Sequence, residues 1–168
     1  MTEADILQLF NNSWLGITVR EVRWLFGAGE TLHFIGLSML IGAMIVVDLR
    51  LLGVWKRIPI SAVLPFTKIA IAGFAINVIS GLAFFCSNPF NYWSNPAFKL
   101  KMFLIVLAGL NVLWFELAER KKVVGLAVGG DTAMDTKINA GLSLTLWILI
   151  IIFGRLLPTF EGATSLFS

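Results

Sequence analysis

Four long apolar segments dominate this chain, and each is long enough to cross a membrane once. They cover approximately residues 24–52, 61–86, 98–117 and 137–157. A hydrocarbon layer of ~30 Å takes about 20 consecutive helical residues per crossing. Since the backbone polar groups of a single span must be satisfied without water, such segments favour helices. The pattern therefore predicts an all-α integral membrane protein whose four-helix bundle occupies residues 21–168.

Composition excludes the soluble classes. The chain is 58% hydrophobic and 14% charged, with a mean hydropathy of +0.87, which lies outside the range of soluble globular domains. It contains no nucleotide-binding fingerprint, phosphate loop or nucleophile elbow, so soluble-enzyme chemistries are not expected. The sequence pI of about 9.3 is explained by contact of basic loops with anionic lipid, and we expect no nucleic-acid partner.

Residues 1–20 precede the first span and have a different pattern. Apolar residues recur there at helical spacing beside polar ones, namely Ile6, Leu7, Phe10, Trp14 and Leu15. This pattern predicts a short amphipathic helix that lies in the membrane interface. Between the second and third spans, residues 88–96 carry two prolines with Tyr92 and Trp93, which predicts a structured cap over one mouth of the bundle.

Basic residues predict the orientation. They flank the first and third connections, which we expect to be cytoplasmic: Arg50, Lys56, Arg57, Arg120, Lys121, Lys122 and Lys137. Both termini are then external. Arg20, Arg23, Lys99 and Lys101 lie on the external side and oppose this assignment.

One layer of polar residues is predicted near the external side of the bundle. Glu30 and His33 are three residues apart and share a helical face, and His33 is the single histidine of the chain. Gly29 and Gly36 flank the imidazole and leave room for a neighbouring helix or for a flat ligand. His33 is then a neutral side chain bonded to Glu30 or a carbonyl, a haem ligand, a ligand of another metal, or a proton-transfer group.

Haem b and copper make different demands on these residues. Haem needs an axial ligand, an apolar slot and cations for its two propionates. His33 is the candidate ligand, Lys101 and Arg155 are the candidate cations, and Trp147 is a candidate for the wall of the slot. The sixth position is left open or is filled by another chain or a methionine. Copper or zinc held by His33 and Glu30 needs further ligands from another subunit, a loop or water. Without a cofactor, Arg155 is expected to pair with Glu30.

A second polar layer is predicted near the cytoplasmic side. It contains two acids and two bases, Asp48, Glu116, Arg50 and Lys68. We expect these groups to pair or to reach the interface and thereby fix the register of the helices. The functional alternative is a proton or ion path through Lys68 and Glu116.

Several motifs occur in a fixed order along the chain. They are Glu30-Thr-Leu-His33, Asp48-Leu-Arg50-Leu-Leu-Gly53, Asn91-Tyr92 followed by Phe98-Lys99-x-Lys101, Ala108-Gly-Leu-Asn111, and Ser143, Trp147 and Gly154-Arg155. With these motifs the chain resembles a family of small bacterial four-helix membrane proteins described mainly as a domain of unknown function. The resemblance implies localisation in the bacterial inner membrane, with periplasmic termini. A looser likeness to copper-resistance D proteins and small membrane b-type cytochromes implies His33 as a candidate ligand.

Two functions from different classes follow from these patterns. The first is a haem- or metal-binding membrane protein with an electron-transfer role, an oxidoreductase or cytochrome that has a redox partner protein. The second is a non-catalytic membrane subunit or small transporter in which Glu30, His33 and Arg155 form a structural polar network. One ligand per chain also predicts a homo-oligomer in the bilayer, because a second copy could complete the coordination sphere.

Overall fold

The computed structural model describes residues 2–160, which form helices and connecting turns with no β-strand in that range. Four helical segments in it are long and apolar enough to span a membrane. They are α3 (Arg23–Leu51), α4 with α5 (Ile60–Val63 and Phe66–Ser87), α7 with η1 and α8 (Pro96–Trp114, Phe115–Glu119 and Arg120–Val124), and α9 (Met134–Phe160). The predicted all-α four-helix bundle is confirmed. Residues 161–168, assigned to the bundle from the sequence, lie outside the described range.

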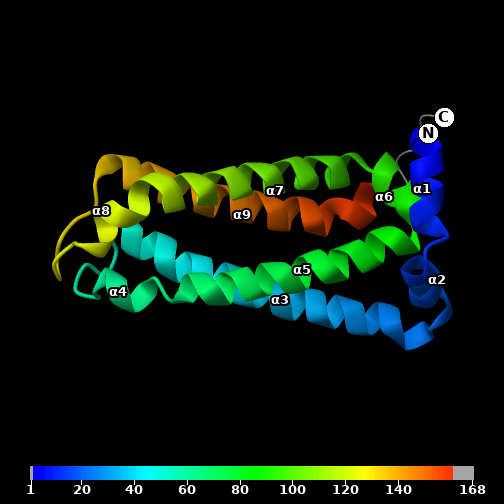
Figure 1. The fold of residues 1–168 in the computed structure, drawn as a ribbon, viewed down its shortest axis with the longest axis horizontal. Coiled ribbons are helices and arrows are strands. Elements are labelled where there is room, and N and C mark those ends of the chain that lie inside the picture. Colours follow the sequence, from blue (N-terminus) through cyan, green and yellow to red (C-terminus); the bar gives the residue numbers. More distant parts are fainter. Residues whose placement is uncertain (1, 161–168) are drawn as a thin grey trace.

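The four spans pack as two hairpins. Helix α3 packs along α5, α7 packs along α9, and the hairpins meet mainly where α3 contacts α9. Figure 1 shows the two pairs side by side, with α4, α8 and the connecting turns at one end and α1, α2 and α6 at the other. We call these the loop end and the terminal end. The arrangement places the predicted outer polar layer near the terminal end.

The third span is longer than the apolar pattern predicts. Helix continues to Val124, seven residues beyond the expected end at residue 117, through the π-helical turn η1. The extra turns are polar, and Arg120 pairs with Glu116 at 2.6 Å while Lys122 pairs with Glu119 at 2.8 Å. Hydrophobic runs predict where a helix enters the bilayer, whereas ion pairs between successive turns stabilise its extension outside the bilayer.

The N-terminal segment forms two helices where the sequence predicts one. Helix α1 (Glu3–Asn11) ends before Ser13, whose hydroxyl accepts the Gly16 amide at 3.1 Å and caps α2 (Trp14–Glu21). The Arg20 guanidinium donates to the carbonyls of Asn11 and Ser87, at 2.7 and 2.9 Å, and ties both helices to the end of α5. Helix α6 (Pro89–Ser94) packs beside α1 at this end, as Figure 1 shows, and supplies the predicted cap.

The two main clusters of buried apolar side chains lie at the centre and toward the loop end of the bundle, and smaller sets of buried apolar residues at the terminal end include Leu7, Val19, Cys86 and Ala97. A central cluster contains Leu40, Ala43, Ala70, Leu104, Ala108, Leu146, Trp147 and Ile150, and a second cluster near the loop end contains Val47, Leu51, Ile60, Phe115, Val123 and Ala140. Buried positions on α3 begin only at Gly36, and those on α9 end at Ile150. In Figure 1, α3 diverges from α9 toward the terminal end. The buried positions of α3 and α9 therefore lie between the middle of the bundle and the loop end.

Candidate functional site

His33 is held by a hydroxyl from the neighbouring helix. Its Nδ1 lies 2.8 Å from Ser80 Oγ, which joins α3 to α5. The same hydroxyl lies 2.7 Å from the Ile76 carbonyl oxygen and donates to it. Since a serine hydroxyl has one hydrogen, Ser80 must accept from His33, so the hydrogen-bond network assigns the proton to Nδ1. The Nε2 atom then carries a free lone pair, which is the state a metal ligand requires.

The glycines around His33 serve the contact between α3 and α5. A Cβ atom added at Gly36 would lie 2.8 Å from the Gly73 carbonyl oxygen, and one added at Gly73 would lie 2.5 Å from the Gly36 carbonyl oxygen. A Cβ at Gly29 would lie 3.1 Å from the ring of Phe84, which also packs against His33 at 5.7 Å between ring centroids. Of the two sequence interpretations, helix packing therefore accounts for both glycines.

Lys101 enters the same region from α7. Its side chain lies along Gly154 of α9, where an added Cβ would be 3.5 Å from Nζ, and its charge lies close enough to His33 for a direct Coulombic interaction. No ion pair joins Lys101 to an acid within residues 2–160. Two of the predicted site residues, His33 and Lys101, thus lie on different hairpins within electrostatic range of each other. An alanine at position 154 would meet the lysine at ordinary van der Waals distance, so the glycine is not needed to make room for it.

The predicted pairing of Glu30 is wrong. Glu30 and Arg155 are both exposed, and neither side chain makes a hydrogen bond or an ion pair within the described part of the chain. Glu30 does not bond His33, whose partner is Ser80. Within residues 2–160, no group of three or more His, Cys, Asp or Glu side chains could hold a metal ion. A copper ion on His33 and Glu30 would therefore draw its remaining ligands from elsewhere.

Trp147 lies in the central core and not beside His33. Its ring packs against Phe74 of α5 at 6.3 Å between centroids, and only 7% of the residue is exposed. Phe74 precedes Ser80 by six residues, which is about 9 Å along a helix of 1.5 Å rise. The sequence pattern assigned Trp147 to the cofactor site because it shares a face with Arg155, but the core packing places it about two turns away.

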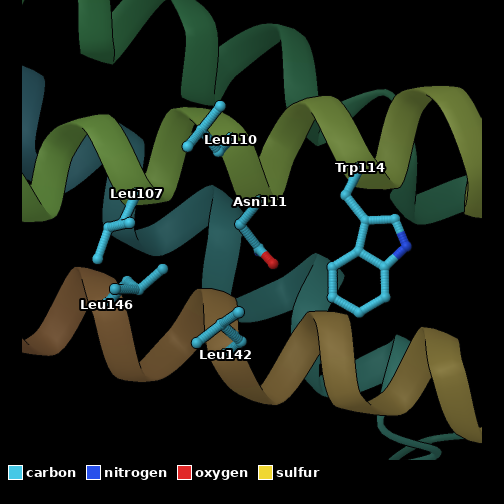
Figure 2. Close-up of a pocket in the computed structure, with 6 residues that line it drawn as sticks. All are labelled: Leu107, Leu110, Asn111, Trp114, Leu142 and Leu146. Atoms are coloured by element: carbon cyan, nitrogen blue, oxygen red, sulfur yellow. The ribbon is translucent and has the colours of Figure 1, made fainter.

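The cavity drawn in Figure 2 does not include the histidine. It measures about 230 Å³ and lies between α7 and α9, lined by Leu107, Leu110, Asn111, Trp114, Leu142 and Leu146. Asn111 is fixed there by Asn139, whose Nδ2 donates to the Asn111 Oδ1 and backbone oxygens, each at 3.0 Å. Four of the six lining residues are leucines, and none of the predicted site residues lines this cavity.

The prediction that the charged residues of the second polar layer pair or reach the interface fits Glu116 and Lys68 but not the two buried residues, Arg50 and Asp48, which form no ion pair within residues 2–160. Arg50 is 1% exposed and donates to the carbonyls of Ile58, Lys56 and Gly130 at 2.6, 3.2 and 3.5 Å. Glu116 pairs with Arg120, and Lys68 is exposed. Asp48 is 3% exposed, and its Oδ2 has no hydrogen-bond partner.

The buried carboxylate with partners is Glu119, which the sequence analysis missed. It is 1% exposed and bonds the Thr136 hydroxyl at 2.6 Å and Lys122 at 2.8 Å. The π turn η1 rotates the helix so that Phe115 and Glu119 both face inward. Apolar periodicity of 3.6 residues cannot predict the rotation that a π turn introduces. The sequence did carry one signal, because the same predicted connection is flanked by Glu119, Lys122 and Thr136.

Comparison with protein-family models, with curated proteins and with solved structures finds no match for this chain. The resemblance drawn from the ordered motifs therefore stays a prediction. Function has to be inferred from the geometry of the site itself.

Proposed function

We propose that the protein is a haem b-binding integral membrane protein with an electron-transfer role, and that His33 is the axial ligand. The observation that carries the proposal is the hydrogen bond from His33 Nδ1 to Ser80, which leaves the Nε2 lone pair free. Ligating histidines in proteins are commonly oriented by such a bond from the other ring nitrogen. Haem, when bound, would supply one-electron redox chemistry.

The residues around His33 fit such a group in two further respects. Lys101 is a cation without an acidic partner in the described chain, and it lies within electrostatic reach of His33. A propionate would neutralise that cation at membrane depth, where an unpaired charge is costly. Arg155, exposed near the same end on α9, is the second candidate for a propionate.

We also propose that the protein forms a homo-oligomer, in which a second copy of the chain would supply any further histidine to the haem, because each chain has only one. Basic residues gather at the loop end, where Lys56, Lys122 and Lys137 are found, and this favours a cytoplasmic loop end. The site would then face the periplasmic side of a bacterial inner membrane, where it would meet a redox partner protein.

The visible spectrum tests the proposal. The protein, purified in mild detergent after expression with a haem supply, should show a Soret band that sharpens on dithionite reduction, with iron stoichiometric to the chain. A colourless, metal-free preparation that binds no added haem would refute the proposal and favour a structural subunit or transporter. Copper without a Soret band would refute haem and favour a metal site on His33.

Variants locate the ligand. His33→Gly should lose the Soret band, and added imidazole should restore it, which separates loss of the ligand from loss of the fold. Ser80→Ala keeps the ligand but removes the bond that orients it, so it should keep haem with weaker affinity. Gly42→Ala is the matched control on α3, because nothing lies within 4 Å of its added Cβ. Full haem content in His33→Gly without imidazole would exclude His33 as the ligand.

A further inference from the structure

Asp48 differs from every other aspartate in the chain. The others, Asp5, Asp131 and Asp135, lie at the ends of the bundle, and each makes a hydrogen bond to a hydroxyl, an amide or a lysine. Asp48 lies near the loop end of α3 with only 3% of its surface exposed, and its Oδ2 is unpartnered. A buried carboxylate normally has a cation or several donors around it, because an isolated buried charge is very costly.

The charged groups around Asp48 are engaged elsewhere or face outward. Arg50 on the same helix donates to three carbonyls through Nε and Nη2 and has a buried Nη1 without a partner, and Lys68 on α5 is exposed. On the third span, Glu116 pairs with Arg120 and Glu119 pairs with Lys122. No ion pair joins Asp48 to a lysine or arginine within residues 2–160.

The groups that face Asp48 from α9 are neutral. Ser143 lies close enough to interact with the carboxyl group, but its Oγ makes no hydrogen bond of normal geometry. One turn further along α9, the Trp147 Nε1 atom is also buried without a partner. Asn139, one turn before Ser143, uses its amide on Asn111. The bundle interior therefore holds one carboxyl oxygen, Asp48 Oδ2, and one hydroxyl oxygen, Ser143 Oγ, without a hydrogen-bond partner.

We propose that Asp48 binds a proton inside the membrane, so that this part of the bundle is a proton-binding site formed by Asp48 and Ser143. A neutral carboxylic acid removes the uncompensated charge and supplies a hydrogen that Ser143 Oγ can accept. A metal cation is a poorer match, because Na⁺ or a divalent ion would need several more oxygen ligands than these two side chains offer. This inference does not depend on haem, since Asp48 lies fifteen residues from His33, about 22 Å along α3.

Infrared spectroscopy of the whole protein in detergent tests the proposal. At neutral pH the protein should show the carbonyl stretching band of a protonated carboxylic acid, and the band should shift in D₂O and disappear in Asp48→Asn. Glu116→Gln is the matched control, because it removes an exposed, paired carboxylate and should leave the acid band unchanged. Ser143→Ala should shift the band by removing the hydrogen-bond acceptor. Absence of the band at neutral pH, or its survival in Asp48→Asn, would overturn the proposal.

Two further measurements keep the test decisive. If Asp48→Asn does not fold, aspartate labelled with carbon-13 in the carboxyl group should shift the band in the otherwise unchanged protein. An unshifted band would assign it to a glutamate and refute the role of Asp48. Thermal unfolding in NaCl against choline chloride distinguishes the ligand: equal Tm values support the proton, whereas a specific rise with Na⁺ would replace it with a sodium site.

Discussion

Gly36 and Gly73 pack directly against each other's backbone, and this contact sets the distance between α3 and α5 beside His33. A Cβ atom on either residue would come within 2.8 Å of the carbonyl oxygen of the other. Both positions are buried. Since backbone atoms cannot move aside as a flexible side chain can, the two helices must separate to accept a methyl group.

Gly36→Ala or Gly73→Ala should therefore destabilise the protein, by about 1–3 kcal/mol as for other overpacked cores. Thermal unfolding in detergent measures the effect. Gly42→Ala on the outer side of α3 is the control and should be neutral or slightly stabilising, because its added Cβ meets nothing within 4 Å. Equal Tm values for Gly36→Ala and Gly42→Ala would show that the close approach of the helices does not matter.

Asn111 and Asn139 predict a second stability effect. Asn139→Ala removes two hydrogen bonds at 3.0 Å and leaves the Asn111 side-chain oxygen without its donor in the buried interface of α7 and α9. Hydrogen bonds between membrane helices contribute about 1–2 kcal/mol in model peptides. We expect a loss of that size in the free energy of unfolding. Thr145→Ala is the control, since its exposed hydroxyl bonds only Gly141 of its own helix.

The sequence predicts the number and approximate limits of the spans because each must bury about 20 apolar residues in lipid. The sequence is a poor guide to helix outside the four apolar segments. There, η1 and α8 are stabilised by ion pairs, and the break between α1 and α2 is set by the Ser13 cap. These features depend on single side chains and not on a periodic pattern. The spacing of hydrophobic residues therefore does not predict them.

The site was only partly predictable for a related reason. Spacing along one helix placed Glu30 beside His33 but could not show which residue of α5 faces the imidazole, and the structure assigns that position to Ser80. Their opposite charges predict an ion pair between Arg155 and Glu30, yet both side chains are exposed. Lys101 stays a predicted site residue, chosen because it is an ionisable group at membrane depth.

Asp131 should titrate at an unusually low pH. Lys56 and Lys137 donate to Asp131 Oδ2 at 2.8 and 2.9 Å and lower the pKa of this exposed carboxyl group from 3.8 to about 2. Because the folded pKa is below the unfolded one, the stabilisation is present above about pH 4 and is lost as pH falls toward 2. Carbon NMR of the labelled carboxyl group measures the midpoint at low salt.

Replacing both lysines by methionine should return the Asp131 midpoint to near 3.8. Asp5 is the internal control: the amide and hydroxyl of Thr2 lower its pKa, so the lysine replacements should not change it. A wild-type midpoint for Asp131 at 3.8 would show that the two ion pairs do not persist in solution.

Arg50 should be the least replaceable charged residue at the loop end. Its guanidinium is buried and donates through Nε and Nη2 to carbonyls on both sides of the loop end, Ile58 and Lys56 after α3 and Gly130 before α9. A lysine has one donor centre and cannot reach these separated acceptors together. Arg50→Lys should therefore cost about 2–4 kcal/mol of unfolding free energy, because buried carbonyls lose a charged donor. Arg57→Lys, at an exposed position in the same loop, should leave the unfolding temperature unchanged. If the two variants unfold alike, the carbonyl contacts of Arg50 do not hold the loop end together.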